Sequence, residues 1–375
     1  MIDLHKTAAW MVFLLGWLWL YAPRGAAEAA GPGLEKDRQN REAGGRIFLA
    51  SREQIIAHAK KEASLRVQSN LEPNVYPHLI KAFQTKYPFI DIRIGEATGA
   101  DTAQRFLLEL KAGRVKDLDV IHMSEEHYGA YLPHLKKFTI KMMAEKGVLS
   151  IPIKMVDPDN PFVVASGTVA SAVAYNRNMI DAPAVPSAWH DFLRPEFKGR
   201  KFIVDIRPQG FAALAAGEGE EWVLDYARKI KDQNPVWTRG QTRALTAIMN
   251  AEYPMHQMTN YHTCMRAAWK DPTKALTCKI VEPVPVRIAL PDAILESAPH
   301  PNAGLLWLEF LASPTGQKII DEHEPLRSSL YSKDSEIEKV TRGKKVSIND
   351  FRTFKHAGKW MNMTFEAFGF PKAER

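Results

Sequence analysis

The chain has 375 residues, of which 45% are hydrophobic and 25% are charged. This composition excludes an intrinsically disordered protein and is sufficient for two domains that each have a core. The net charge of +7 comes from 50 basic and 43 acidic residues that are intermixed along the chain, without a long basic block or a basic-aromatic repeat. A nucleic-acid-binding surface is therefore not expected.

The N-terminus has the pattern of an export signal. Lys6 precedes an apolar run over residues 8–22, and small residues of the Ala-X-Ala kind follow it. A run of 15 apolar residues is short for a membrane span, so we predict a cleavable signal peptide over residues 1–30. An uncleaved membrane anchor is the alternative. The polar stretch that follows is interpreted as a flexible leader, residues 31–50.

The next segment alternates between helical and strand patterns. Apolar residues recur with helical spacing in some stretches and at every second position in others. Helices are predicted at residues 53–62, 75–86 and 102–112, and strands at residues 65–68, 90–94 and 119–123. Each strand ends in a small polar loop. In an open α/β sheet such loops gather along one edge, where ligands bind.

The rest of the chain repeats this pattern in a second unit. A strand pair at residues 162–167 and 169–176 is expected to lead into it. Further strands are predicted at residues 202–205 and 284–290, and helices at residues 220–231, 242–251, 302–311 and 315–321. The charged remainder is predicted to be mostly helical. This order of elements predicts a second α/β unit after the strand pair.

Residues 252–262 are the stretch most typical of a ligand site. A short apolar strand ends in Thr-Asn-Tyr-His, residues 259–262, and passes directly into a helix predicted over residues 263–269. A strand that leads directly into a helix presents backbone N–H groups, here beside a phenol and an imidazole. Tyr261 and His262 are candidate ligands of a trivalent metal ion. In the alternative, Tyr261 packs over an organic ligand or in the core.

Arg207 is the candidate for binding a charged group. It follows a predicted strand end and precedes Pro208, Gln209 and Gly210, where a guanidinium can bind an anion through two hydrogen bonds. A surface salt bridge is the alternative for this residue.

Signatures of catalysis are absent from the sequence. It has no G-x-S-x-G, H-E-x-x-H or G-x-x-x-x-G-K-[ST] motif. His122 and Glu125 lie close to Glu126 and His127, but the strand direction at His122 and the solvated helix expected at Glu126 disfavour a metal site there. The sequence therefore favours binding over turnover.

Cys264 and Cys278 are the two cysteines of the chain. In an exported protein they can close a disulfide across 14 positions, and two buried free thiols are the alternative. Without a C-x-x-C motif or further cysteines, a thiolate metal site is not expected.

The order and spacing of many short segments resemble the periplasmic solute-binding proteins of ATP-driven (ABC) importers, in the group related to the ferric-iron-binding proteins. Examples are Val-Ala-Tyr-Asn at residues 173–176 and Thr-Arg-Gly-Gln-Thr at residues 238–242. The other matching segments are residues 55–68, 82–88, 98–105, 118–120, 197–200, 251–254, 298–303 and 310–317. Together they extend over most of the mature chain.

The resemblance implies a type 2 periplasmic-binding-protein fold, with two α/β lobes, crossing hinge strands and a ligand cleft between the lobes. Lobe 1 is expected to comprise residues 51–170 and 285–320, and lobe 2 residues 171–284 and 321–375. Tyr175 and residues 287–290 are expected near the two crossings. The ligand loops of the family map onto Ser69, Asn70, Thr98, Gly99, Ser124, Glu125, Arg207, Gln209, Asn260, Tyr261 and His262. Iron-binding members usually hold the metal with two adjacent tyrosines, and the second position here is His262.

The function implied by the resemblance is that of an extracytoplasmic solute-binding component of an ABC importer. The solute is expected to be a small organic or phosphorylated anion, ranked above ferric iron, and to be captured by hinge closure. Delivery to a permease in the inner membrane, a periplasmic location, a monomeric state and the absence of both cofactor and nucleic-acid partner are further expectations. A secreted enzyme or a ligand sensor with the same two-lobed fold is the alternative.

Overall fold

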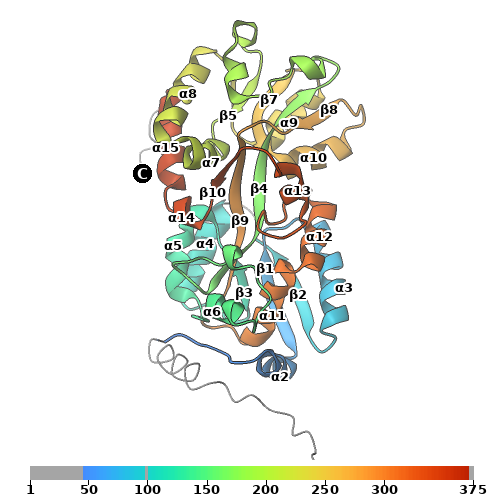
Figure 1. Ribbon diagram of the computed structural model, residues 1–375, viewed down its shortest axis with the longest axis vertical. Coiled ribbons are helices and arrows are strands. Elements are labelled where there is room, and N and C mark those ends of the chain that lie inside the picture. Colours follow the sequence, from blue (N-terminus) through green and yellow to red (C-terminus); the bar gives the residue numbers. More distant parts are fainter. Residues whose placement is uncertain (1–44, 98–99, 371–375) are drawn as a thin grey trace, which may run out of the picture.

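The computed structural model describes residues 45–97 and 100–370. The predicted signal peptide, most of the leader, and the candidate residues Thr98 and Gly99 lie outside these ranges. Figure 1 shows two α/β lobes along the long axis of the molecule, with the long strands β4 and β9 running between them. Among the described helices, none is both long and apolar enough to cross a membrane.

Lobe 1 is built on strands β1 to β3, which form a parallel set. β1 pairs with β2 from Ser64 to Ser69 and with β3 at Val67. The elements of this lobe are α2 (Arg52–Glu62), β1 (Ser64–Ser69), α3 (Tyr76–Lys86), β2 (Asp91–Glu96), α4 (Ala100–Lys111), β3 (Val120–His122), α5 (Tyr128–Tyr131) and α6 (Ile140–Glu145). The sequence predicted the three strands and the three longest helices, α2, α3 and α4, but it did not predict α6. Ser51 caps α2 through a 3.2 Å hydrogen bond from the Gln54 backbone N–H, which is why the helix begins there.

Two long antiparallel strands connect the lobes. β4 (Val163–Asn176) is buried at every position, and β9 (Val284–Ile294) is buried at all but one. The first half of β4 pairs with β9, while its second half pairs with β7 and β8 of lobe 2. The predicted strand pair is thus wrong, because the chain continues through Gly167 without a break. Within the described residues all strands form one sheet of ten, in the order β2-β1-β3-β9-β4-β7-β5-β6, with β10 beside β9 and β8 beside β4.

Lobe 2 carries its own sheet segment and two apolar clusters. Its elements are β5 (Ile203–Asp205), α7 (Gln209–Glu218), α8 (Glu220–Asp232), β6 (Val236–Thr238), α9 (Gln241–Met249), β7 (Met255–Asn260), α10 (Tyr261–Lys270) and β8 (Leu276–Lys279). The larger cluster contains Trp189, Phe192 and Phe211. The sequence analysis did not predict helix α7, whose residues are mostly small and apolar, so that no amphipathic pattern marks it. It also placed the start of α10 two residues too late.

The C-terminal segment contacts both lobes. It comprises α11 (Pro301–Ala312), α12 (Pro314–His323), α13 (Glu336–Thr341), β10 (Val346–Asn349), α14 (Phe351–Phe354) and α15 (Ala357–Ala367). Phe351 and Phe354 join the core of lobe 1, whereas Phe368 joins the larger cluster of lobe 2. The expected assignment of residues 321–375 to lobe 2 is therefore wrong for α14, because its phenylalanines are buried against the other lobe.

The end of the predicted leader is also part of the fold. Phe48 and Leu49 are buried in the core of lobe 1, and the Ile47 backbone N–H donates to the Lys137 carbonyl at 2.9 Å. The flexible-leader prediction is wrong for these residues, because apolar side chains at 47–49 have a core to enter.

Candidate ligand site between the lobes

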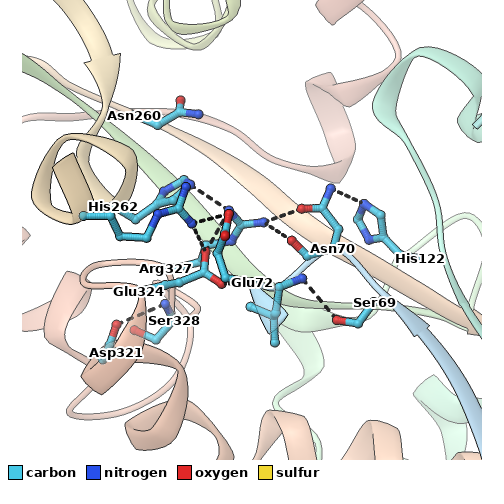
Figure 2. A network of polar contacts seen from close by, with 12 residues as sticks. Ser69, Asn70, Glu72, His122, Asn260, His262, Asp321, Glu324, Arg327 and Ser328 are labelled. Atoms are coloured by element: carbon cyan, nitrogen blue, oxygen red, sulfur yellow. Dashed lines mark hydrogen bonds and ion pairs between the residues drawn. The ribbon is translucent and has the colours of Figure 1, made fainter. Parts of the chain in front are cut away.

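Arg327 lies at the centre of a polar network between the lobes (Figure 2). Its guanidinium Nη2 donates to Asn70 Oδ1 at 2.7 Å, and its Nη1 lies 2.7 Å from His262 Nε2. The Glu324 carboxylate is 3.2 Å from the same Nη1. Asn70 belongs to lobe 1 and His262 to lobe 2, so one guanidinium connects both lobes.

The hinge strand β4 fixes the segment that carries Arg327. The Thr168 backbone N–H donates to the carbonyls of Arg327 and Ser328, both at 3.2 Å, and Thr168 Oγ1 donates to the Ser328 carbonyl at 2.6 Å. A Cβ atom at Gly167 would lie 2.7 Å from the Arg327 carbonyl oxygen. Only glycine allows the segment to approach the strand this closely.

A second chain of contacts continues from Asn70 into lobe 1. The Asn70 side-chain amide is 3.1 Å from His122 Nε2, and His122 Nδ1 is 3.3 Å from the Asp292 carboxylate. Burial raises the pKa of Asp292, and its contacts with His122 act in the opposite direction. This chain orients the amide of Asn70 toward Arg327.

Arg287, on β9, is the second guanidinium of the site. Its Nη1 donates to Glu125 Oε1 at 2.8 Å, and its Nη2 lies 3.3 Å from Gln209 Oε1 and 3.5 Å from Asn260 Oδ1. Its Nε is buried and has no hydrogen-bond partner in the described ranges. Three predicted residues from different loops, Glu125, Gln209 and Asn260, thus meet at one arginine.

Arg266, on α10, is the third guanidinium. It lies 2.5 Å from the Glu72 carboxylate and 3.6 Å from that of Glu324. Burial lowers the pKa of His262 well below its ordinary value, and the positive charges of Arg327, Arg266 and Arg287 lower it further. His262 is therefore neutral at pH 7, with Nε2 accepting from Arg327 and Nδ1 carrying the hydrogen. That Nδ1 is buried without a partner among residues 45–97 and 100–370.

Arg207 has a different environment from these three. Its Nη2 is 3.1 Å from Asp205 Oδ2, and the Asp205 carboxylate also accepts from the backbone N–H groups of Arg207 at 3.0 Å and Gly240 at 3.3 Å. The Arg207 side chain is 52% exposed. Its guanidinium is turned back onto its own strand end, as in the surface-salt-bridge alternative.

Tyr261 begins helix α10 and packs against an apolar cluster. The buried members of this cluster include Val284, Val286 and Leu326. Burial raises the pKa of the Tyr261 phenol, so the phenolate form that a metal requires is disfavoured. The described parts of the chain also contain no group of three or more His, Cys, Asp or Glu residues placed to hold a metal ion.

The remaining predicted residues lie at the margin of the site. Ser69 ends β1, and its hydroxyl accepts from the Leu71 backbone N–H at 3.2 Å, which shapes the loop that carries Asn70. Ser124 precedes the short 3-10 turn η2 (Glu125–His127). A small cavity of about 10 Å³, large enough for one water molecule, lies at the strand ends of lobe 2 beside Gln209, Gln241 and Asn260.

Cys264 and Cys278 form a disulfide with Cα atoms 6.1 Å apart. The bond joins the first turns of α10 to β8, which pairs with β4. It therefore fixes the helix that carries His262 and Arg266.

The sequence missed the charged centre of the site. Arg327, Arg266, Glu72 and Glu324 were not singled out, and Arg287 was placed near a crossing without a role. No local pattern marks Arg327, since it lies in an irregular segment after α12. Its place in the site is defined only in the folded protein, where that segment packs over β4.

A family model of bacterial extracellular solute-binding proteins matches residues 132–357. Sequence comparison finds no significant match to a curated protein.

Several solved structures share the fold. Iron-bound HitA from Pseudomonas aeruginosa is similar with a TM-score of 0.61 and 17% identity, over 81% of this chain and 99% of that one. IdiA (FutA) from Trichodesmium, in complex with iron and citrate, gives a TM-score of 0.63 and 16% identity over 81% and 99%. The ferric binding protein from Campylobacter jejuni gives 0.62 and 19% over 82% and 100%. The predicted two-lobed type 2 fold is confirmed by this likeness.

Proposed function

The chain belongs to the bacterial extracellular solute-binding proteins, and we propose that it binds a small anionic solute between its lobes for delivery to an ABC permease. The choice of an anionic solute rests on one observation: Arg266, Arg287 and Arg327 lie together at one site. Glu72, Glu125 and Glu324 balance the formal charge of these arginines. The forked N–H donors of three guanidinium groups nevertheless suit the oxygens of carboxylate, phosphate or sulfate groups.

Donors that lack a partner point to the same class of solute. Arg287 Nε, Arg327 Nε and His262 Nδ1 are buried and make no hydrogen bond within the described structure. Leaving a buried charged donor unsatisfied costs on the order of 1–3 kcal/mol. A solute with several acceptor oxygens would remove this cost, whereas a cationic solute would add repulsion.

Contacts from both lobes would couple binding to closure. Asn70 and Glu125 belong to lobe 1, Gln209 and Asn260 belong to lobe 2, and Arg287 lies on the strand that joins them. A solute that contacts both sides stabilises the closed arrangement by the difference in its affinity for the two states. The hinge strands β4 and β9 are the elements that would bend.

A periplasmic location, a monomeric state and the lack of catalytic activity belong to this proposal. The pair formed by His122 and Asp292 superficially resembles part of a hydrolase triad. However, His122 Nε2 faces the Asn70 amide at 3.1 Å rather than a nucleophile. The arrangement suits the positioning of Asn70 better than proton transfer.

Ferric iron is the second candidate, since HitA and IdiA (FutA) are iron-bound in the similar structures. Glu125, Tyr261 and His262 would supply the ligand types for it. Against iron stand the arginine on His262 Nε2 and the raised pKa of Tyr261. A ferric-loaded protein with a tyrosinate ligand should show a visible absorption band, so titration with ferric citrate separates the two candidates.

Isothermal titration of the mature protein tests the main proposal. The panel contains inorganic phosphate, sulfate, succinate and citrate, with putrescine as a cationic control. We expect saturable binding of at least one anion, a smaller radius of gyration on binding, and no binding of putrescine. Binding of putrescine alone, or of iron alone with a visible band, would overturn the anion assignment.

A further inference from the structure

We infer that Glu125 is a tethered substitute for the anionic group of the solute, which the solute must displace from Arg287. This inference rests on the proposed function and adds a residue that sets the affinity and the charge requirement of the site. The carboxylate of Glu125 already binds Arg287, the arginine that loops of both lobes contact.

The geometry of the pair is that of a bound carboxylate ligand. Glu125 Oε1 accepts from Arg287 Nη1 at 2.8 Å, and the two side chains are only 16% and 12% exposed. The other terminal nitrogen of the guanidinium, Nη2, donates to Gln209 and Asn260 of lobe 2. A carboxylate from lobe 1 thus completes a set of partners that is otherwise drawn from lobe 2.

Glu125 is also able to leave. It begins the three-residue turn η2 after β3, so a local change of this turn removes it without disturbing the sheet. Glu324 is the contrasting case, because its side chain is fully buried and also accepts from the Glu72 backbone N–H at 2.7 Å. Of these two carboxylates, only Glu125 is placed to exchange with a solute.

A charge requirement follows from this exchange. An entering group must compete with an ionised carboxylate at high effective concentration, so a neutral polar group is too weak to replace it. Carboxylate, phosphate and sulfate groups meet the requirement. Displacement also frees the lobe 1 loop to contact another part of the solute.

Glu125→Gln tests the inference, since it keeps the shape and removes the competing charge. Glu296→Gln is the matched control, because it makes the same charge change in lobe 1, at a carboxylate that is 64% exposed and paired with Lys136, outside the site. We expect Glu125→Gln to tighten binding of the anion found in the panel at least tenfold, and Glu296→Gln to change it less than about threefold, as is usual for exposed pairs.

A second readout is independent of any solute. Phenylglyoxal labels accessible arginines, and peptide mapping reports its rate at Arg287. In the solute-free protein we expect faster labelling of Arg287 in Glu125→Ala than in the wild type, with Arg207 as the internal reference. Weaker anion binding by Glu125→Gln, an effect equal to that of Glu296→Gln, or unchanged labelling of Arg287 would each overturn the inference. If no anion binds any variant, the proposed function fails, whereas wild-type binding with unchanged labelling removes this inference alone.

Discussion

Two arginine regions near the interlobe site, around Arg207 and around Arg327, have opposite environments. Arg207 lies directly after a strand, where a sequence pattern predicts an anion site, yet it is half exposed and paired with Asp205. Arg327 lies in an irregular segment, yet it is 7% exposed and holds partners from both lobes. The environment of a charged residue therefore depends less on its place relative to strands in the sequence than on whether the fold buries its segment.

The ion pairs of the two regions should also differ in how much they contribute to the free energy of unfolding. Exposed ion pairs contribute little because solvent screens them, whereas removing one member of a buried pair leaves an uncompensated charge. The predictions below measure this difference, from the largest expected effect to the smallest.

Arg327→Met should destabilise the protein most. The substitution leaves the fully buried Glu324 carboxylate without its nearest cation, at a cost of about 3–5 kcal/mol in the free energy of unfolding. Urea unfolding monitored by tryptophan fluorescence measures it. The double variant Arg327→Met with Glu324→Gln is the control, and it should be more stable than Arg327→Met alone. Equal stability of the two variants would contradict the role given to the buried pair.

Replacing Cys264 and Cys278 by serine should cost about 3 kcal/mol, the value for a loop of this length. The loss acts on helix α10, so anion affinity should fall together with stability. Unfolding curves of the variant and of the wild type, each with and without reductant, provide the measurement. Reductant should affect the wild type only, and a sensitivity of the variant would point to another cause.

The buried His256, which lies near Asp205 in the Arg207 region, should make the free energy of unfolding depend on pH. Burial lowers the pKa of His256 from 6.5 to about 4, and the nearby Asp205 acts in the opposite direction. The unfolded chain therefore binds this proton more readily. The contribution of the neutral ring is fully present above pH 6.5 and is lost as the pH falls toward 4, by about 3 kcal/mol.

His256→Gln isolates this effect, because buried Asp292 and Asp321 have raised pKa values and shift stability in the other direction at low pH. We expect the difference in unfolding free energy between pH 7 and pH 4.5 to be smaller in the variant. Parallel pH profiles of variant and wild type would show that His256 does not titrate in this way.

Arg207→Ala should have the smallest effect on stability, below about 1 kcal/mol, since its pair with Asp205 is exposed on one side. Anion affinity should fall less than it does in Arg287→Lys, which keeps the charge but loses the forked geometry. Titration of both variants with the same anion compares them. A larger loss at Arg207 would reverse the ranking of the two regions.

The sequence alone predicted most of the fold, because β1, α3, β2 and α8 have clear periodicity, and Ser51 marks the start of α2. It also predicted loop residues that the structure brings together, such as Asn70, Glu125, Gln209 and Asn260. It could not place Arg327, since no local pattern encodes the crossing of an irregular segment over β4. It named the salt bridge of Arg207 only as an alternative, because the pairing with Asp205 depends on the backbone turn after β5.

The two ends of the described chain are fixed to different lobes. Phe48, before α2, is buried in the core of lobe 1, and Phe368, after α15, is buried in lobe 2. Figure 1 shows α2 at the far end of lobe 1 and α15 alongside lobe 2. Donor and acceptor fluorophores attached near residues 45 and 370 would therefore change their energy transfer when the lobes close. The fold could thus serve as an optical sensor that reports capture of a solute before its identity is known.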